Sequence, residues 1–303
     1  MSHETERVGG DSDRRRVFAV TSGQATSDGA GVRLRRYIGS QELDQLDPFL
    51  LLDFFESDNP DDYIAGFPSH PHRGFETVTY LLAGTVRHED SAGHSGVIES
   101  GGIQWMTAGR GIVHSEMPEQ EHGRLAGFQL WVNLPGREKM CRPRYHEHPA
   151  KDIPVETRVD GTRIRVIAGL TREGTQGRVQ GINTDPLYLD AEVPPGQRFS
   201  ETLPAAHAAF VFVINGPVVI RDTDSRERQI STGQLAVLDQ GRTVEVSAGD
   251  NVARFLLVAA RPLNEPVARY GPFVMNTRQE VMDAFKDFQE GKMGQLVDQP
   301  ERV

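Results

Sequence analysis

The chain of 303 residues repeats a pattern of glycines about 132 residues further along. This shift places Gly84 on Gly216, Gly101 on Gly233 and Gly109 on Gly241, and it brings FETVTYLLAG over HAAFVFVING. Self-similarity at a fixed interval indicates that one folding unit occurs more than once. The repeat therefore predicts two similar domains in tandem.

Both copies read as β structure. Residues 32–38 alternate apolar and polar side chains, as a half-exposed strand does. Glycine and proline, with 31 and 18 residues, exceed their usual combined share of roughly 12%, which favours many short strands joined by tight turns. Asn215 and Gly216 both tolerate positive φ and predict a type I′ hairpin between the runs on either side. Residues 278–289 carry an apolar stripe with a 3.6-residue period and predict a helix. The fold class expected is all-β with a short C-terminal helix.

Composition excludes several classes of function. The formal net charge of -10 opposes a nucleic-acid backbone, so direct nucleic-acid binding is not expected. Cys141 is the one cysteine, which excludes a disulfide framework and fits a reducing compartment; we expect this thiol to be buried or inert. No apolar run reaches membrane-spanning length, and the N-terminus has no apolar signal segment. We expect a cytoplasmic monomer.

Two pairs of metal-binding side chains lie in the first copy. His70 and His72 form one pair, and His114 and Glu116 form the other. Side chains at i and i+2 of a strand leave the same face, so each pair can grip an ion. Three imidazoles and a carboxylate suit Fe(II), Mn(II), Ni(II), Cu(II) or Zn(II) better than Mg²⁺ or Ca²⁺. The repeat shift replaces these four residues in the second copy by Thr202, Pro204, Val246 and Ala248.

Other histidines are interpreted as unrelated to a metal. The sequence His146-Glu147-His148 resembles another such pair, but it lies in a connection rich in proline and arginine, so we expect a solvated linker. His88 and His94 flank a charged turn and are expected to be exposed.

Four motifs give a resemblance to a known family. HPHRGFETVTYLLAG, WMTAGRGIVHSEMP, FQLWVNLP and GPFVMNT resemble the pirin family of the cupin superfamily. The resemblance implies two tandem cupin barrels of the jelly-roll (double-stranded β-helix) type, with iron in the first. It also implies that the iron ligands are His70, His72, His114 and Glu116.

The domain boundaries expected from these observations are as follows: a disordered leader at 1–16, a metal-binding barrel at 17–135, a linker at 136–162, a second barrel without metal ligands at 163–275, and a C-terminal helix and tail at 276–303.

The resemblance implies two kinds of function. Some pirins act as quercetin 2,3-dioxygenases, which open the flavonol ring with O₂, and others are redox-sensitive regulators that contact transcription factors or metabolic enzymes. For the enzyme we expect an Fe(II) cofactor, a flavonol-like substrate and Glu116 as the proton acceptor, whereas a regulator would need a protein partner.

Three further residues are pocket candidates. Gln129 and Trp105 are close in sequence to the motif strands. Glu76 lies four positions beyond His72. In the wider cupin superfamily this residue often supplies the carboxylate ligand, so it stays an alternative to Glu116.

Overall fold

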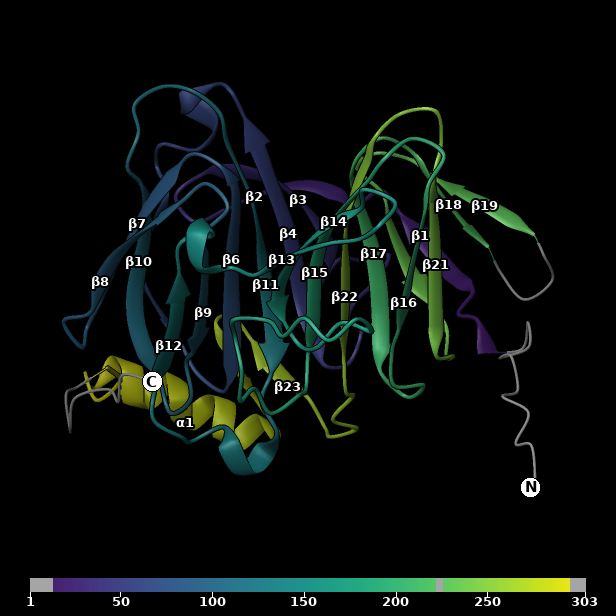
Figure 1. Cartoon of the computed structure of the whole chain (residues 1–303). Coiled ribbons are helices and arrows are strands. Elements are labelled where there is room, and N and C mark those ends of the chain that lie inside the picture. The colour runs from purple at the N-terminus through teal and green to yellow at the C-terminus, as the bar shows by residue number, and fades with distance from the viewer. Residues whose placement is uncertain (1–12, 222–225, 295–303) are drawn as a thin grey trace. The chain divides into compact units, whose positions relative to one another are not determined.

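The structure, a computed structural model, describes residues 13–221 and 226–294 and consists mainly of β-strands (Figure 1). Its strands fall into two compact units. We call them the N-terminal barrel, formed by residues 23–153, 181–184 and the segment from Leu263 onward, and the C-terminal barrel, formed by the remaining residues up to Pro262.

The N-terminal barrel has two facing sheets. Its larger sheet has the order β12-β9-β6-β11-β4-β3-β2; these strands are β2 (Gln24–Asp28), β3 (Val32–Ile38), β4 (Phe49–Ser57), β6 (Phe75–Ala83), β9 (Ile103–Thr107), β11 (Leu125–Asn133) and β12 (Arg144–His148). The smaller sheet has the order β5-β10-β7-β8; these strands are β5 (Phe67–His72), β7 (Thr85–Asp90), β8 (Ser95–Glu99) and β10 (Ile112–Pro118). Three short 3₁₀ turns belong to the same unit: η2 (Pro60–Asp62), η3 (Gly136–Glu138) and η4 (Ala150–Asp152).

The C-terminal barrel repeats this arrangement. Its larger sheet has the order β1-β20-β17-β22-β15-β14-β13 and its smaller sheet the order β16-β21-β18-β19. Its strands are β1 (Val17–Thr21), β13 (Val155–Thr157), β14 (Arg163–Ala168), β15 (Leu187–Val193), β16 (Arg198–Thr202), β17 (Ala208–Asn215), β18 (Val218–Arg221), β19 (Glu227–Ile230), β20 (Leu235–Leu238), β21 (Thr243–Ala248) and β22 (Ala253–Ala260). The strand orders of the two barrels match except at one edge of the larger sheet, where β12 follows β11 in the chain but β1 precedes all other strands of both barrels. This agreement confirms the repeat and the expected fold class of two tandem jelly-roll barrels.

A hairpin and a helix complete the N-terminal unit. Strands β23 (Ala268–Tyr270) and β24 (Phe273–Met275) pair with each other, and α1 (Arg278–Gln289) follows. Thr277 caps this predicted helix in a capping box with Glu280. Phe273, Val281 and Ala284 are buried in the cluster that joins the helix to β24. No helix among the described residues is long and apolar enough to cross a membrane.

The N-terminal segment differs from its expected role. Residues 1–12 of the expected leader lie outside the described residues, but Arg15 is 1% exposed and donates hydrogen bonds to the carbonyls of Pro204 and Gly241. Strand β1 pairs with β20, so it extends the sheet of the C-terminal barrel, whereas we had assigned it to the first barrel. The cause is hydrogen bonding at the edge of β20, a long-range contact that local pattern does not reveal.

The hairpin predicted at Asn215-Gly216 is wrong. Strand β17 pairs with β20 and β22, whereas β18 pairs with β19 and β21 in the other sheet. Gly216, with φ +68, therefore turns the chain from one sheet to the facing one. A Cβ at this position would lie 2.4 Å from the carbonyl oxygen of Val252, so the turn needs glycine for space as well as for conformation.

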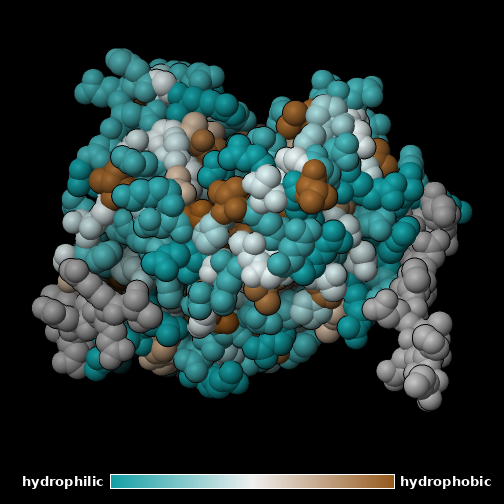
Figure 2. All heavy atoms as spheres, in the orientation of Figure 1, coloured by the Kyte–Doolittle hydropathy of each residue, from teal (hydrophilic) through white to brown (hydrophobic). Residues whose placement is uncertain are grey.

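The two barrels differ in their interiors. The C-terminal barrel is filled by a large apolar cluster in which the rings of Phe199 and Phe255 lie 5.3 Å apart. The N-terminal barrel has a smaller apolar cluster around Leu34, Phe55 and Leu81. Other parts of its interior contain buried histidines and buried polar side chains that form hydrogen bonds. On the face drawn in Figure 2, hydrophilic residues predominate and hydrophobic ones form small groups.

Candidate metal centre

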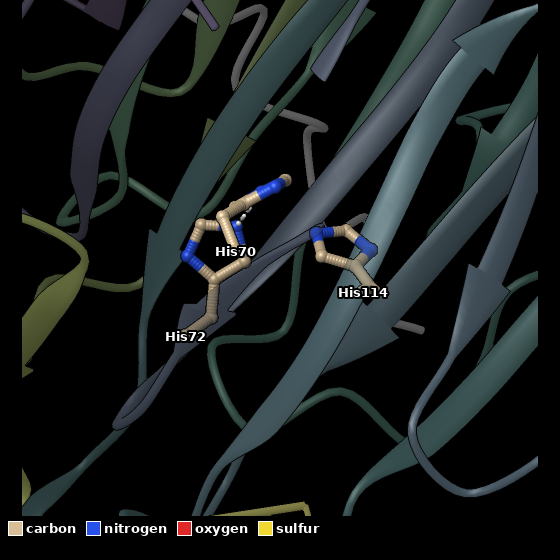
Figure 3. Close-up of side chains that lie close together, drawn as sticks. All are labelled: His70, His72 and His114. Atoms are coloured by element: carbon tan, nitrogen blue, oxygen red, sulfur yellow. Dashed lines mark hydrogen bonds between the residues drawn. The ribbon is translucent and has the colours of Figure 1, made fainter. Parts of the chain in front are cut away.

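Three histidines converge inside the N-terminal barrel. His70 and His72 lie on β5, and His114 lies on the neighbouring strand β10, directly opposite His70. Each offers a ring nitrogen, and these nitrogens all lie within 4.8 Å of one another. The Nε2 atoms of His70 and His72 are 2.9 Å apart. Figure 3 shows the three rings close together, carried by the two strands.

The protonation of these rings suits metal binding. Nδ1 of His70 lies 2.8 Å from the carbonyl oxygen of Pro68, and a hydrogen bond there would leave Nε2, which faces His72, as the ligand atom. Burial, with a smaller contribution from the neighbouring histidines, lowers the pKa values of His72 and His114 well below their usual range. Neutral imidazole is the form that binds a metal.

Unpartnered nitrogens give a direct test of fit. Nδ1 of His72 and both ring nitrogens of His114 are buried without a hydrogen-bond partner. Leaving a buried polar atom unsatisfied costs about 1–3 kcal/mol. A bound divalent ion would give one of the His114 nitrogens a partner, so the residues present fit a metal of the borderline class.

Glu116 stands beside the three histidines without being part of their cluster. The ladder between β10 and β5 is irregular between His114 and Glu116. The Glu116 carboxylate is 4% exposed and accepts hydrogen bonds from the Thr79 hydroxyl at 2.8 Å and the Gln129 amide at 2.9 Å. Three of the four expected ligands, the histidines, thus lie close together. The fourth, Glu116, is hydrogen-bonded to Thr79 and Gln129 instead.

A cavity of about 580 Å³ opens onto this site. His70, His72, Glu116 and Gln129 are among its lining residues, and so are Trp131 and Arg269. The guanidinium of Arg269 lies over the Trp131 ring, 4.8 Å from its centroid. Arg36, which also lines the cavity, donates two hydrogen bonds to Asp53. Gln129, one of the pocket candidates, thus lines the cavity.

Trp105 and Glu76 lie away from the cavity, contrary to expectation. Gly74, with φ +88, turns the chain so that β6 begins in the other sheet, and Glu76 points to the face opposite Thr79. Both candidate residues are completely buried. The Glu76 carboxylate accepts hydrogen bonds from Trp105 at 3.1 Å and Thr107 at 2.8 Å. Burial is the main cause that raises the pKa of Glu76 to about 7.

Three residues that we had set aside meet inside the same barrel. His88 is 1% exposed, so its expected exposure is wrong, and it forms a 2.8 Å contact with Glu147. The expected solvated linker contains β12, which pairs with β9 and carries Glu147. His94 completes the group. By contrast, burial raises the pKa of the Cys141 thiol, which agrees with an unreactive cysteine.

The C-terminal barrel has an ion pair in the corresponding region. Strand β16 places Phe199 opposite Val246, and Glu201 opposite Val244. By strand register these two β16 residues correspond to His70 and His72, a different alignment from the one that the sequence shift gave. The guanidinium of Arg158 donates to Glu201 and Glu156 at 2.8 Å each and lies 5.0 Å from the centre of the Phe199 ring.

Comparisons with known proteins agree with the fold. The family model named Pirin matches residues 31–132, and the model of the pirin C-terminal cupin domain matches residues 188–294. A pirin-like protein of Caulobacter vibrioides is 51% identical over 279 residues, which cover 92% of this chain and 99% of that protein. The chain belongs to the pirin family.

Two other similar proteins support the same assignment. Human pirin is 45% identical over 270 residues, covering 88% of this chain and 90% of that protein. A crystal structure of quercetin 2,3-dioxygenase from Acinetobacter baumannii has a TM-score of 0.83 and 35% identity, and the match covers 94% of this chain and 100% of that one. The pirin model falls on the N-terminal barrel. The pirin C-terminal model covers much of the C-terminal barrel and also residues 263–294, which belong to the N-terminal unit. The two models together therefore extend over both units.

Proposed function

We propose that this pirin-family protein is an Fe(II)-dependent dioxygenase of the quercetin 2,3-dioxygenase type, which opens the ring of a flavonol with O₂. The observation that carries the proposal is the three-histidine cluster that borders, together with Glu116, on a cavity of about 580 Å³. This volume lies within the range of roughly 300–1,000 Å³ that is typical of small-molecule sites. The name of the similar A. baumannii protein supports this choice of substrate.

The residues that would hold the ion are His70, His72 and His114, with Glu116 as a fourth ligand. Mn, Ni, Cu and Zn suit the same donor set, so the ligands alone do not select one metal. We choose Fe(II) because the resemblance to pirins favours it. A bound divalent ion would supply Lewis acidity that lowers the pKa of a hydroxyl placed beside it.

The protein itself supplies a base and a shaped cavity. Glu116 is the carboxylate at the site, and we assign it the role of accepting the substrate hydroxyl proton. Thr79 and Gln129 each hold one of its oxygens, so the base is positioned before the substrate arrives. Trp131 and Arg269 form a wall against which an aromatic ring can stack. Low exposure of His72 and Glu116 limits competing reactions with water.

An aerobic quercetin assay tests the proposal. Iron-loaded protein should bleach the flavonol absorbance and release carbon monoxide, and the double variant His70→Ala, His114→Ala should do neither. His122→Ala removes an exposed histidine of the same barrel and should keep wild-type turnover. Metal content is measured on every sample. Iron-loaded wild type that bleaches no faster than the double variant would rule out a flavonol substrate.

A second candidate function is a regulatory role that depends on the oxidation state of the metal. It is favoured by the C-terminal barrel, which has nearly the same strand order as the first but an apolar core. The pair of Arg158 and Glu201 lies in its region that corresponds to His70 and His72. Such a barrel contributes surface rather than chemistry. If the iron-loaded protein does not turn over quercetin, and its binding to a partner protein differs between the Fe(II) and Fe(III) forms, the regulatory function is favoured over the enzymatic one.

A further inference from the structure

A second group of metal-binding side chains lies inside the N-terminal barrel. It consists of His88 on β7, His94 on the turn before β8, and Glu147 on β12. Their ligand atoms all lie within 4.8 Å of one another. Nε2 of His88 is 2.8 Å from Oε2 of Glu147, and Nε2 of His94 is 3.7 Å from the same oxygen. Ligands around a tetrahedral ion with bonds of about 2.0–2.2 Å are about 3.3–3.6 Å apart, a spacing that lies between these two distances.

This group is separate from the three-histidine site. The three-histidine site consists of His70, His72 and His114, and it shares no residue with the group formed by His88, His94 and Glu147. Glu116 lies opposite His88 in the β10–β7 ladder, yet its two oxygens accept hydrogen bonds from Thr79 and Gln129. The two groups therefore share the barrel interior with different ligand atoms.

Buried nitrogens in the second group lack partners. Nδ1 of His88 and Nε2 of His94 are both buried without a hydrogen bond. Of these two nitrogens, Nε2 of His94 faces the Glu147 carboxylate, at 3.7 Å from Oε2. A divalent ion held between the carboxylate and the two Nε2 atoms would give it a partner.

The surrounding residues keep the group open and ordered. A Cβ at position 96 would lie 2.4 Å from Oε1 of Glu147 and 2.5 Å from Nε2 of His88, so Gly96 preserves the space between them. The ring of Tyr145 stacks on His94 with centroids 4.6 Å apart. Oδ1 of Asp90 accepts hydrogen bonds from the backbone N–H groups of Ala92 and His94, which fixes the turn that carries His94.

We propose that His88, His94 and Glu147 form a second metal site, which binds a borderline divalent transition ion such as Zn²⁺ or Co²⁺. Two imidazoles and one carboxylate supply three ligands and leave a fourth coordination position open, as in catalytic zinc sites. The proposal does not depend on the dioxygenase function, because it concerns metal binding alone.

Metal stoichiometry tests this site. Apoprotein is titrated with Co²⁺, followed by visible absorbance, and bound Zn²⁺ is counted by elemental analysis after dialysis. Wild type should bind two equivalents, and the double variant His94→Ala, Glu147→Gln should bind one. The double variant His70→Ala, His114→Ala should also bind one. A single equivalent in wild type, or two in the His94→Ala, Glu147→Gln variant, would overturn the proposal.

Two single variants make the result independent of folding defects. Gly96→Ala keeps every ligand and needs no unusual φ, but its methyl group displaces the Glu147 carboxylate, so it should lose the second equivalent and keep the first. His146→Gln is the matched control, because this residue neighbours Glu147 on β12 and points to the opposite face. It should bind two equivalents. Two equivalents in folded Gly96→Ala would contradict the proposed cradle and with it the site.

Discussion

The side-chain amide of Gln129 donates a hydrogen bond of 2.9 Å to Oε2 of Glu116. Gln129 lies on β11 in the larger sheet, and Glu116 lies on β10 in the smaller one. This bond therefore joins the two walls of the N-terminal barrel at the candidate metal centre. It fixes the direction of the carboxylate, which the proposed reaction uses as a base.

Replacing Glu116 by glutamine should abolish most turnover. The amide keeps the size of the side chain but cannot accept a proton at neutral pH, so we expect kcat for quercetin to fall by about 10²–10⁴-fold, the usual contribution of a positioned base. The measurement is the bleaching rate at saturating quercetin, normalised to bound iron. Glu99→Gln, an exposed change on β8, is the control. Unchanged turnover per iron in Glu116→Gln would exclude the role as base.

Replacing Arg269 by alanine should weaken substrate binding more than turnover. Its guanidinium covers the Trp131 ring and donates to the carbonyl of Leu50, so the change removes one wall of the cavity. We expect the KM for quercetin to rise about tenfold, which corresponds to about 1.4 kcal/mol. Steady-state kinetics check this, with Arg33→Ala as a control because Arg33 is exposed and pairs with Asp62 instead. An unchanged KM would show that the aromatic substrate binds elsewhere.

Glu76 should make stability fall as pH rises. Burial raises its pKa from 4.5 to about 7, so the folded state holds a proton that the unfolded state releases earlier. The contribution of this protonated carboxyl to the free energy of unfolding is fully present below pH 4.5 and is lost as pH rises to about 7. At about 1.4 kcal/mol per pH unit, the loss approaches about 3 kcal/mol.

Glu76→Gln should therefore gain stability relative to wild type as pH rises from about 5 to 7, because glutamine keeps the partners Trp105 and Thr107 without titrating. Thermal unfolding midpoints of both proteins, recorded with a chelator across this range, give the difference directly. The same comparison with Glu99→Gln should show no such trend. A constant difference between Glu76→Gln and wild type would mean that this carboxyl titrates normally in the folded protein.

Arg158→Ala should destabilise the C-terminal barrel. Glu201 is completely buried and depends on this guanidinium for charge balance, and removing one partner of a buried pair costs about 3–5 kcal/mol. The double change Arg158→Leu, Glu201→Leu should cost less than the single one, because it leaves no unpaired charge at position 201. Denaturant unfolding measures both, and Arg163→Ala is the exposed control. Equal stability of Arg158→Ala and wild type would show that the pair is not structural.

The local pattern of the sequence predicted much of this molecule. Its strands, the repeat and the C-terminal helix follow from periodicity and glycine spacing, which are local properties. His70 and His72 could also be paired in advance, because the i+2 spacing on strands fixes which face each side chain leaves. The same spacing paired His114 with Glu116, whereas the three-histidine cluster leaves Glu116 out. Gln129 followed from its nearness to a motif strand.

Long-range pairing and changes of sheet could not be predicted. Glu76 is four residues beyond His72, but Gly74 ends one strand and the next begins in the other sheet, so counting alternate residues across the turn gives the wrong face. His88 and Glu147 are 59 positions apart and meet because β12 pairs with β9, not because of any signal near either residue.

The edge position of β1 has a consequence for making this protein in parts. Residues 17–21, synthesised before any strand of the N-terminal barrel, form the outermost strand beside β20. A fragment that starts at the nominal boundary near Pro154 would leave the β20 edge bare and ready to pair with another chain. During translation, β1 is made before β20, so β20 can pair with it as soon as β20 itself has been synthesised. A fragment designed to contain the C-terminal barrel must therefore also include β1.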